Sequence, residues 1–153
     1  MVTNEEFRFL AAEQARASRV MLSAVLLEPV ARNTGPAIAA AAAFALERFG
    51  EGAILKVLAS DHEIAADGAY FDAMYQARAT VLCKLVAIGI NPTEPATGYG
   101  YIQFGEQLTS GAYNIERYVE KPTLEEAEKM LGEGNSVWNS GIFMFSARQI
   151  FNE

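Results

Sequence analysis

Short apolar runs alternate with helical patterns in the first ninety residues of the chain. Three runs have the length of buried strands and end at polar or turn-forming residues: 21–27, 53–59 and 82–90. Two helical patterns separate them, over 34–49 and 68–81, with Thr34 and Asp67 at their N-cap positions. Because strands that alternate with helices form parallel sheets with right-handed crossovers, the pattern predicts an α/β fold with a mainly parallel sheet and helices on both faces.

Four further elements are predicted around this core: a helix over 3–18, a β-hairpin over 97–102 and 113–119, a helix over 123–131, and a strand over 140–145. Thr3 and Glu6 have the spacing of a capping box at the first of these helices, as do Thr123 and Glu126 at the second. There is no internal repeat and no linker, so we expect residues 1–153 to belong to a single domain.

The composition is that of a folded globular domain. The net charge is −7 and the 12 Lys and Arg residues are scattered, which argues against nucleic acid or an anionic membrane surface as a partner. The longest apolar run, 35–46, is too short to span a membrane, and the N-terminus lacks a signal-peptide pattern. A single cysteine, Cys83, excludes an intrachain disulfide and fits a reducing compartment. We therefore expect a cytoplasmic protein.

Polar side chains follow the first two predicted strands, at the edge where parallel sheets bind their ligands. Glu28 ends the first strand and precedes the run Arg32-Asn33-Thr34, and Asp61 follows the second strand. A carboxylate at this place suits Mg²⁺, which often takes only one or two from protein, although aspartate is also a common turn residue. His62, the only histidine, is either a general base or a hydrogen-bonded structural residue.

Three further segments carry groups that suit a sugar phosphate. Glu120 and Lys121 stand where a strand ends, with their side chains expected on opposite faces of that strand. They form either a solvated pair or a site in which the carboxylate accepts hydrogen bonds from sugar hydroxyls while the ammonium contacts a phosphate. Asn139 can donate and accept beside Trp138, an indole that is otherwise typical of a core. The segment 98–100 marks either a turn or a place where backbone N–H groups face a ligand.

These segments occur in a fixed order along the chain. The motifs are Glu28-Pro29-x-x-Arg32-Asn33-Thr34-x-Pro36-Ala37, Asp61-His62, Thr97-Gly98-Tyr99-Gly100-Tyr101-Ile102, Val119-Glu120-Lys121-Pro122 and Trp138-Asn139-Ser140-Gly141. From Val2 to Phe145 the series resembles the mannose-1-phosphate guanylyltransferases, a branch of the sugar nucleotidyltransferases. The resemblance implies a Rossmann-like nucleotide-diphospho-sugar transferase fold, here incomplete.

The resemblance also implies a reaction, in which GTP and mannose 1-phosphate give GDP-mannose and diphosphate with Mg²⁺ as cofactor. In the family pattern the guanine base is recognised by Glu28, Arg32, Asn33 and Thr34. Asp61 would be a ligand of the catalytic Mg²⁺, with His62 in a supporting role. The mannose site would be lined by Gly98, Tyr99, Glu120 and Asn139, and Lys121 would hold the sugar phosphate as the second catalytic residue.

Two features of the family pattern do not occur in these 153 residues: the N-terminal glycine-rich loop with its Arg and Pro-Lys elements, and a second metal carboxylate. We therefore expect the chain to be the central part of one nucleotidyltransferase domain, with little or no activity alone and a tendency to self-associate through exposed sheet edges. Two alternatives stay open: a sister sugar-1-phosphate nucleotidyltransferase, and a non-catalytic module that binds a nucleotide sugar. Whether a mannose-6-phosphate isomerase module accompanies the domain is also open.

Overall fold

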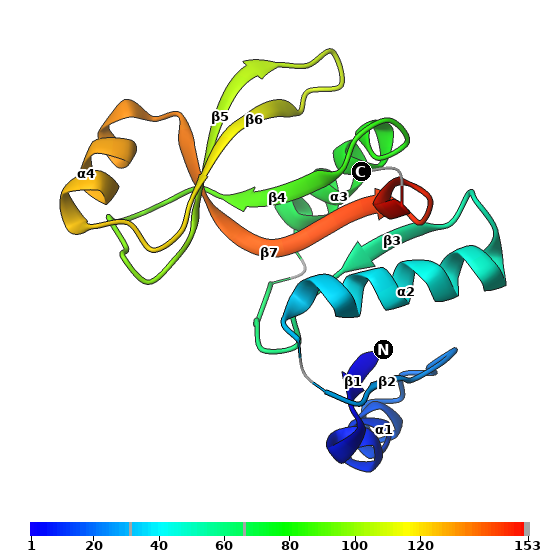
Figure 1. Cartoon of the computed structure of the whole chain (residues 1–153). Coiled ribbons are helices and arrows are strands. Elements are labelled where there is room, and N and C mark those ends of the chain that lie inside the picture. The colour runs from blue at the N-terminus through cyan, green and yellow to red at the C-terminus, as the bar shows by residue number, and fades with distance from the viewer. Residues whose placement is uncertain (31, 66, 152–153) are drawn as a thin grey trace.

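The computed structural model describes residues 1–30, 32–65 and 67–151 (Figure 1). Its elements, in chain order, are β1 (Val2–Asn4), the 3₁₀ helix η1 (Glu5–Phe7), α1 (Arg8–Ala17), β2 (Leu26–Glu28), α2 (Thr34–Phe49), β3 (Ile54–Val57), α3 (Gly68–Thr80), β4 (Val86–Ile90), β5 (Tyr101–Gln107), β6 (Tyr113–Val119), α4 (Leu124–Glu133), β7 (Ser136–Ser146) and the 3₁₀ helix η2 (Gln149–Phe151).

Strand β7 is the centre of the larger sheet, and every strand that pairs with it is antiparallel to it. β4 lies along one edge of β7, with Ile90 opposite Trp138. β3 and β5 pair with the two ends of the other edge, because Val57 lies opposite Phe143 and Tyr101 lies opposite Trp138. β6 continues the sheet as the antiparallel partner of β5, which completes the predicted hairpin.

The predicted α/β class with a β-hairpin insertion is confirmed, but the predicted parallel strands are not neighbours. β3 and β4 run in the same direction, as the crossover through α3 requires, yet β7 lies between them. A helical crossover fixes the direction and handedness of two strands but not their adjacency, so it leaves room for a strand from later in the chain. β2 lies outside this sheet and pairs in parallel with β1, where Thr3 is opposite Leu27.

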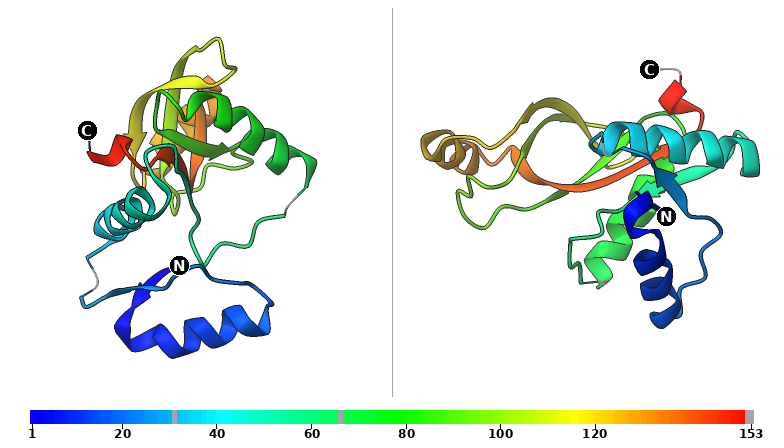
Figure 2. Two further views of the ribbon diagram at one scale, coloured as in Figure 1. Left: turned by 90° about the vertical axis from the view of Figure 1, so that its right-hand side faces the viewer. Right: turned by 60° about the horizontal axis from the view of Figure 1, so that its bottom comes forward.

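Helices cover both faces of the larger sheet, as predicted. In Figure 1 α2 lies in front of the strands and α3 behind them, and the left view of Figure 2 shows the strands between the two helices. The alanine-rich α2 buries Ala42 and Ala45, whose small side chains allow the helix to pack closely. Two buried apolar clusters form, one of Ala77, Val81 and Met144 and one of Tyr101, Ala127 and Met130. β7 reaches both clusters, through Met144 at one end and Trp138 at the other.

A small unit of β1, α1 and β2 lies below the larger sheet in Figure 1. The predicted start of its helix is wrong, because Thr3 belongs to β1 and the Asn4 side chain accepts the capping hydrogen bond from the Glu6 N–H at 3.0 Å. Asparagine reaches a backbone N–H two residues on, so it caps the turn directly after the strand. Apolar side chains of α1 remain exposed, including Phe9 at 72% and Leu10 at 53%.

The starts of the other helices test the capping predictions. Asp67 caps α3, and Thr123 and Glu126 form the predicted capping box at α4. The prediction for α2 is wrong: Thr34 is the first helical residue, and Asn33 occupies the N-cap position with φ 63° and no side-chain capping bond. With ψ −170° this backbone conformation is uncommon for any residue other than glycine, and the helix begins one residue earlier than expected, without a side-chain cap.

The boundaries of three predicted strand segments differ from those in the structure. β5 begins at Tyr101 rather than at Thr97 and continues to Gln107, while β7 begins at Ser136, four residues before the predicted start. β6 ends at Val119, so Glu120 and Lys121 lie in a bend and not on opposite faces of a strand. The prediction for β7 missed its first four residues, which include the buried Ser136 and the half-buried Trp138, because polar residues interrupt the apolar pattern there. Within the described ranges, no helix is long and apolar enough to cross a membrane.

Candidate functional site

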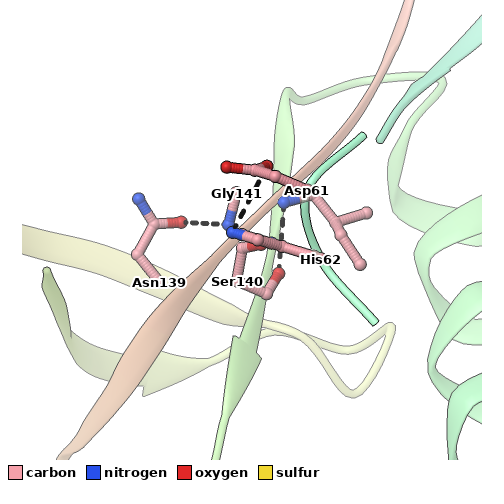
Figure 3. A network of polar contacts seen from close by, with 6 residues as sticks. Asp61, His62, Asn139, Ser140 and Gly141 are labelled. Carbon is pink, nitrogen blue, oxygen red and sulfur yellow. Dashed lines mark hydrogen bonds and ion pairs between the residues drawn. The ribbon is translucent and has the colours of Figure 1, made fainter. Parts of the chain in front are cut away.

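The turn after β3 is attached to the middle of β7 by the only histidine of the chain (Figure 3). Nδ1 of His62 lies 3.0 Å from the carbonyl oxygen of Ser140, and Nε2 lies 3.9 Å from Oδ1 of Asp61. A carbonyl oxygen only accepts hydrogen bonds, so this contact places a proton on Nδ1. The Asp61 side chain is 84% exposed, which leaves its carboxylate accessible from solvent.

A sharp turn in β7 orients the amide of Asn139 beside this contact. Gly141 has φ 70°, a conformation that favours glycine, and its N–H donates to Oδ1 of Asn139 at 3.1 Å. A Cβ on Gly141 would lie 3.4 Å from Cε1 of His62, so the imidazole packs directly over the glycine. The NH₂ group of Asn139 points away from this turn (Figure 3). It is therefore the end of the amide that a ligand would meet.

The segment before β5 brings Glu120 next to the same asparagine. The Asn139 N–H donates to the Gly100 carbonyl at 2.8 Å. A Cβ on Gly100 would lie 2.8 Å from Oε2 of Glu120 and 3.8 Å from Cβ of Asn139. The Glu120 carboxylate thus lies against the Gly100 backbone, a close approach that any side chain at position 100 would block.

An aromatic pair borders this group of residues. The rings of Tyr99 and Trp138 lie with their centroids 5.0 Å apart at an interplanar angle of 59°, and Tyr99 is 53% exposed. Gly98 lies in the preceding bend, with no heavy atom within 4 Å of a Cβ built there. Lys121 is exposed next to Glu120 and has φ 45°. The predicted mannose residues therefore gather around Gly100 and Asn139.

The predicted guanine-binding residues come from other elements, the end of β2 and the start of α2. Glu28 is half-buried at the end of β2, and the run Arg32-Asn33-Thr34 is exposed at the start of α2. No hydrogen bond or ion pair between described residues links them to Asp61 or Asn139. The structure thus brings together the sugar and metal candidates and does not join the nucleotide candidates to them.

The donor set around Asp61 suits a metal ion that takes most of its ligands from elsewhere. Among the described residues, no three His, Cys, Asp or Glu side chains gather in a way that could hold a metal ion. Mg²⁺ is commonly bound through one or two carboxylates, with waters and substrate phosphates as its other ligands. The single exposed carboxylate of Asp61 fits that pattern, whereas Zn²⁺, with its three or four protein ligands, is not matched.

A cavity among the described residues lies away from these candidates. It has a volume of about 900 Å³ and lies between α3, β4 and the β5–β6 hairpin, where Thr80 and Lys84 face Tyr113 and Asn114. None of the predicted site residues lines it. The candidate site is instead an open surface formed by loops at the middle of β7. An open surface is expected where most of the binding groups for a substrate come from several loops.

Two residues of the site were not predicted individually from the sequence. Ser140 is 3% exposed and contacts the His62 turn through its carbonyl, and Gly100 makes room for Glu120. Both belong to motifs that the sequence analysis identified, but their roles depend on contacts between distant segments. In the sequence, the only indication of their importance is that each lies next to a residue predicted to bind the sugar.

A family model for nucleotidyl transferases matches residues 1–153. The mannose-1-phosphate guanylyltransferase of Sinorhizobium fredii is 51% identical over 154 residues, which cover 100% of this chain and 30% of that protein. Xanthan biosynthesis protein XanB of Xanthomonas campestris pv. campestris is 48% identical, with 100% of this chain and 32% of that protein covered. The crystal structure of mannose-1-phosphate geranyltransferase from Thermus thermophilus matches with a TM-score of 0.84 and 32% identity, over 99% of this chain and 43% of that one.

These similarities confirm the resemblance that the ordered motifs indicated. The chain spans about a third of the length of the curated relatives it matches. Members of the matching family act on nucleoside triphosphates and sugar phosphates and generally use a divalent metal ion. Because the family model covers the whole chain and the fold is shared with a structure that is 32% identical, this chain belongs to the nucleotidyl transferase family.

Proposed function

We propose that this chain is the central part of an enzyme domain that converts GTP and mannose 1-phosphate to GDP-mannose and diphosphate. The observation that carries the proposal is the convergence of Glu120 and Asn139 on Gly100, beside the turn that holds Asp61. Two relatives add support, since one is named mannose-1-phosphate guanylyltransferase and the other is named for xanthan biosynthesis.

The sugar would be recognised by groups of complementary hydrogen-bonding character. The Glu120 carboxylate accepts hydrogen bonds from hydroxyls, and the NH₂ of Asn139 donates to ring or hydroxyl oxygens. Tyr99, half-exposed and supported by Trp138, offers an aromatic surface for the apolar face of the sugar ring. Gly98 has open space around its Cα, so its backbone is accessible to a ligand. Together these groups discriminate by the positions of the hydroxyls.

In the chemical step, the protein must position the two substrates and neutralise their negative charge. A phosphate oxygen of mannose 1-phosphate attacks the α-phosphorus of GTP, and the bond to the diphosphate leaving group breaks. The nucleophile is already an anion, so no general base is needed. Both substrates are anionic and the chain has a net charge of −7, so Lys121 would hold the sugar phosphate against that repulsion. Mg²⁺ bound at Asp61 would supply further positive charge at the α-phosphate.

The guanine base would be recognised by the run after β2. Glu28 offers a carboxylate that matches the neighbouring N–H donors of guanine, and Arg32, Asn33 and Thr34 are exposed beside it.

The chain also has an exposed free thiol at Cys83, which fits the proposed cytoplasmic location.

The first test separates substrate binding from turnover. Mannose 1-phosphate is titrated into the purified chain while the fluorescence of Trp138, the only tryptophan, is followed. We expect saturable binding that Glu120→Gln weakens and that glucose 1-phosphate does not match. Equal binding of the two sugar phosphates would favour a sister enzyme over the proposed one.

The second test concerns activity. We expect the 153-residue chain to form GDP-mannose at a rate far below that of an intact relative, because the family's glycine-rich loop is not in its sequence. GDP-mannose formation at an ordinary enzyme rate would contradict this. In the intact gene product, comparison of GTP, dTTP and UTP identifies the base, and a complete lack of turnover with retained binding would favour a non-catalytic module.

We also propose that the isolated chain self-associates. β1 and β3 each have an edge with no strand partner among the described residues, and α1 exposes Phe9 and Leu10. Unpaired strand edges and exposed apolar side chains recruit further copies of a chain. Light scattering at increasing concentration tests this, and a monodisperse monomer at high concentration would refute it.

A further inference from the structure

The Ser140 side chain bridges β4 and β7 at the point where the pairing of the two strands is irregular. The register between these strands shifts between Ala87 and Gly89. At this point the Ser140 hydroxyl donates to the Ile88 carbonyl at 2.6 Å and accepts from the Ile142 N–H at 3.1 Å. A hydroxyl can do both at once, which few other side chains can. The serine therefore fixes this part of β7 relative to β4.

The backbone of the same residue holds the turn after β3. The Ser140 carbonyl accepts the hydrogen bond from Nδ1 of His62, and the imidazole lies over Gly141. Asp61 directly precedes His62, while Asn139 directly precedes Ser140. One hydrogen bond thus links Asp61-His62, where Asp61 is the candidate metal ligand, to Asn139-Ser140, where Asn139 is a candidate for sugar binding (Figure 3).

We propose that His62 is a positioning residue, whose Nδ1–H to Ser140 hydrogen bond fixes the Asp61 carboxylate at a constant separation from Asn139. The inference rests on the proposed function of these two residues in metal and sugar binding. The proposed reaction needs no base because it starts from an anion, and Nδ1 of the imidazole is engaged by the Ser140 carbonyl. Its contribution is geometric, and a shift of about 1 Å at such a site costs about 100-fold in rate.

The first experiment measures the order of the Asp61 turn without any metal. ¹⁵N relaxation is recorded for the wild-type chain, His62→Leu and His62→Asn. Leucine removes the donor at similar size, whereas asparagine keeps an N–H near the place of Nδ1. We expect the order parameter of the Asp61 amide to fall from about 0.85 to below about 0.6 in His62→Leu and to recover in His62→Asn.

The amides of Gly89 and Ile142 serve as the internal control, because the Ser140 hydroxyl donates to the Ile88 carbonyl, which shares a peptide group with the Gly89 N–H, and accepts from the Ile142 N–H, both independently of the imidazole. They should keep their order in all three proteins. An Asp61 amide that stays equally ordered in His62→Leu would overturn the inference. So would a parallel loss of order at Gly89 and Ile142, since that would give His62 a general structural role.

The second experiment uses Mn²⁺ alone as a paramagnetic probe. Bound at Asp61 in the wild-type chain, it should broaden the amide signals of Asn139 and Gly141, and this broadening should weaken several-fold in His62→Leu and return in His62→Asn. Asp61→Asn should abolish it. If broadening survives Asp61→Asn, or if Mn²⁺ broadens no signal at all, the proposed metal role of Asp61 fails, while the order parameters still decide for or against His62.

Discussion

Replacement of Gly100 by alanine should weaken sugar binding while leaving the fold intact. The new Cβ would lie 2.8 Å from Oε2 of Glu120, against about 3.4 Å for an ordinary contact, so the carboxylate must move by about 0.6 Å or more. The displaced atom is the end of a flexible side chain and Gly100 does not have a left-handed φ, so the cost in stability should stay below about 1 kcal/mol.

The effect on binding should be much larger than the effect on stability. A hydrogen bond to a charged acceptor contributes about 1.5–3 kcal/mol, and sugar hydroxyls bond well only within about 2.5–3.0 Å. Loss of one such bond corresponds to a roughly 10- to 100-fold rise in the Kd for mannose 1-phosphate. Titration of Trp138 fluorescence measures the Kd, and urea unfolding of the same sample measures the stability.

Gly105→Ala is the matched control for this experiment. It introduces a clash with another glutamate, because its Cβ would overlap the Glu116 carboxylate, and it lies within β5, farther along the hairpin from the candidate site than Gly100. We expect it to change the stability and not the Kd. An unchanged Kd in Gly100→Ala, or an equal rise in both variants, would refute the assignment of Glu120 to sugar binding.

Two further predictions concern stability. Ser140→Ala should lower the free energy of unfolding by about 1–3 kcal/mol in urea titrations, since it leaves the Ile142 N–H and the Ile88 carbonyl without their hydroxyl partner; an unchanged midpoint would contradict the bridging role. Hydrogen bonds from the backbone and side chain of Thr123 lower the pKa of Glu126 below its ordinary value of 4.5. A depressed folded-state pKa gives stability that is present above the unfolded-state value and is lost as the pH falls through the folded-state value. Stability should therefore decline as the pH falls below about 4.5, and Glu126→Gln, measured by thermal unfolding at several pH values, should show a smaller decline.

The starts of two helices could be predicted because their signals are local. Asp67 and the Thr123–Glu126 pair cap their helices as expected, since capping depends on residues three positions apart. The insertion of β7 between β3 and β4 could not be predicted in the same way. Strand order depends on contacts between residues far apart in the chain, and the pattern of one strand does not identify its neighbours.

The candidate site shows the same division. Residue types and motif order identified Asp61, Glu120 and Asn139 as candidate ligand-binding residues, because the hydrogen-bonding and charge properties of a side chain are known from the sequence alone. Their arrangement depends on Gly100 and Ser140, whose importance comes from a Cβ that would not fit and a hydroxyl that bridges two strands. Packing constraints of this kind appear only when the partner segments are known.

The late position of β7 in the chain has a consequence for the order of folding. Its ladder with β3 joins residues about ninety positions apart, such as Ile54 and Ser146, so β3 cannot acquire this partner until Ser146 has been synthesised. Long-range pairings of this kind slow folding, because the intervening chain must first lose its freedom. During synthesis, a chain that has emerged only as far as Lys121 contains most of the candidate ligand-binding residues but lacks the strand that gathers them. The candidate site is therefore assembled only after β7 has been synthesised.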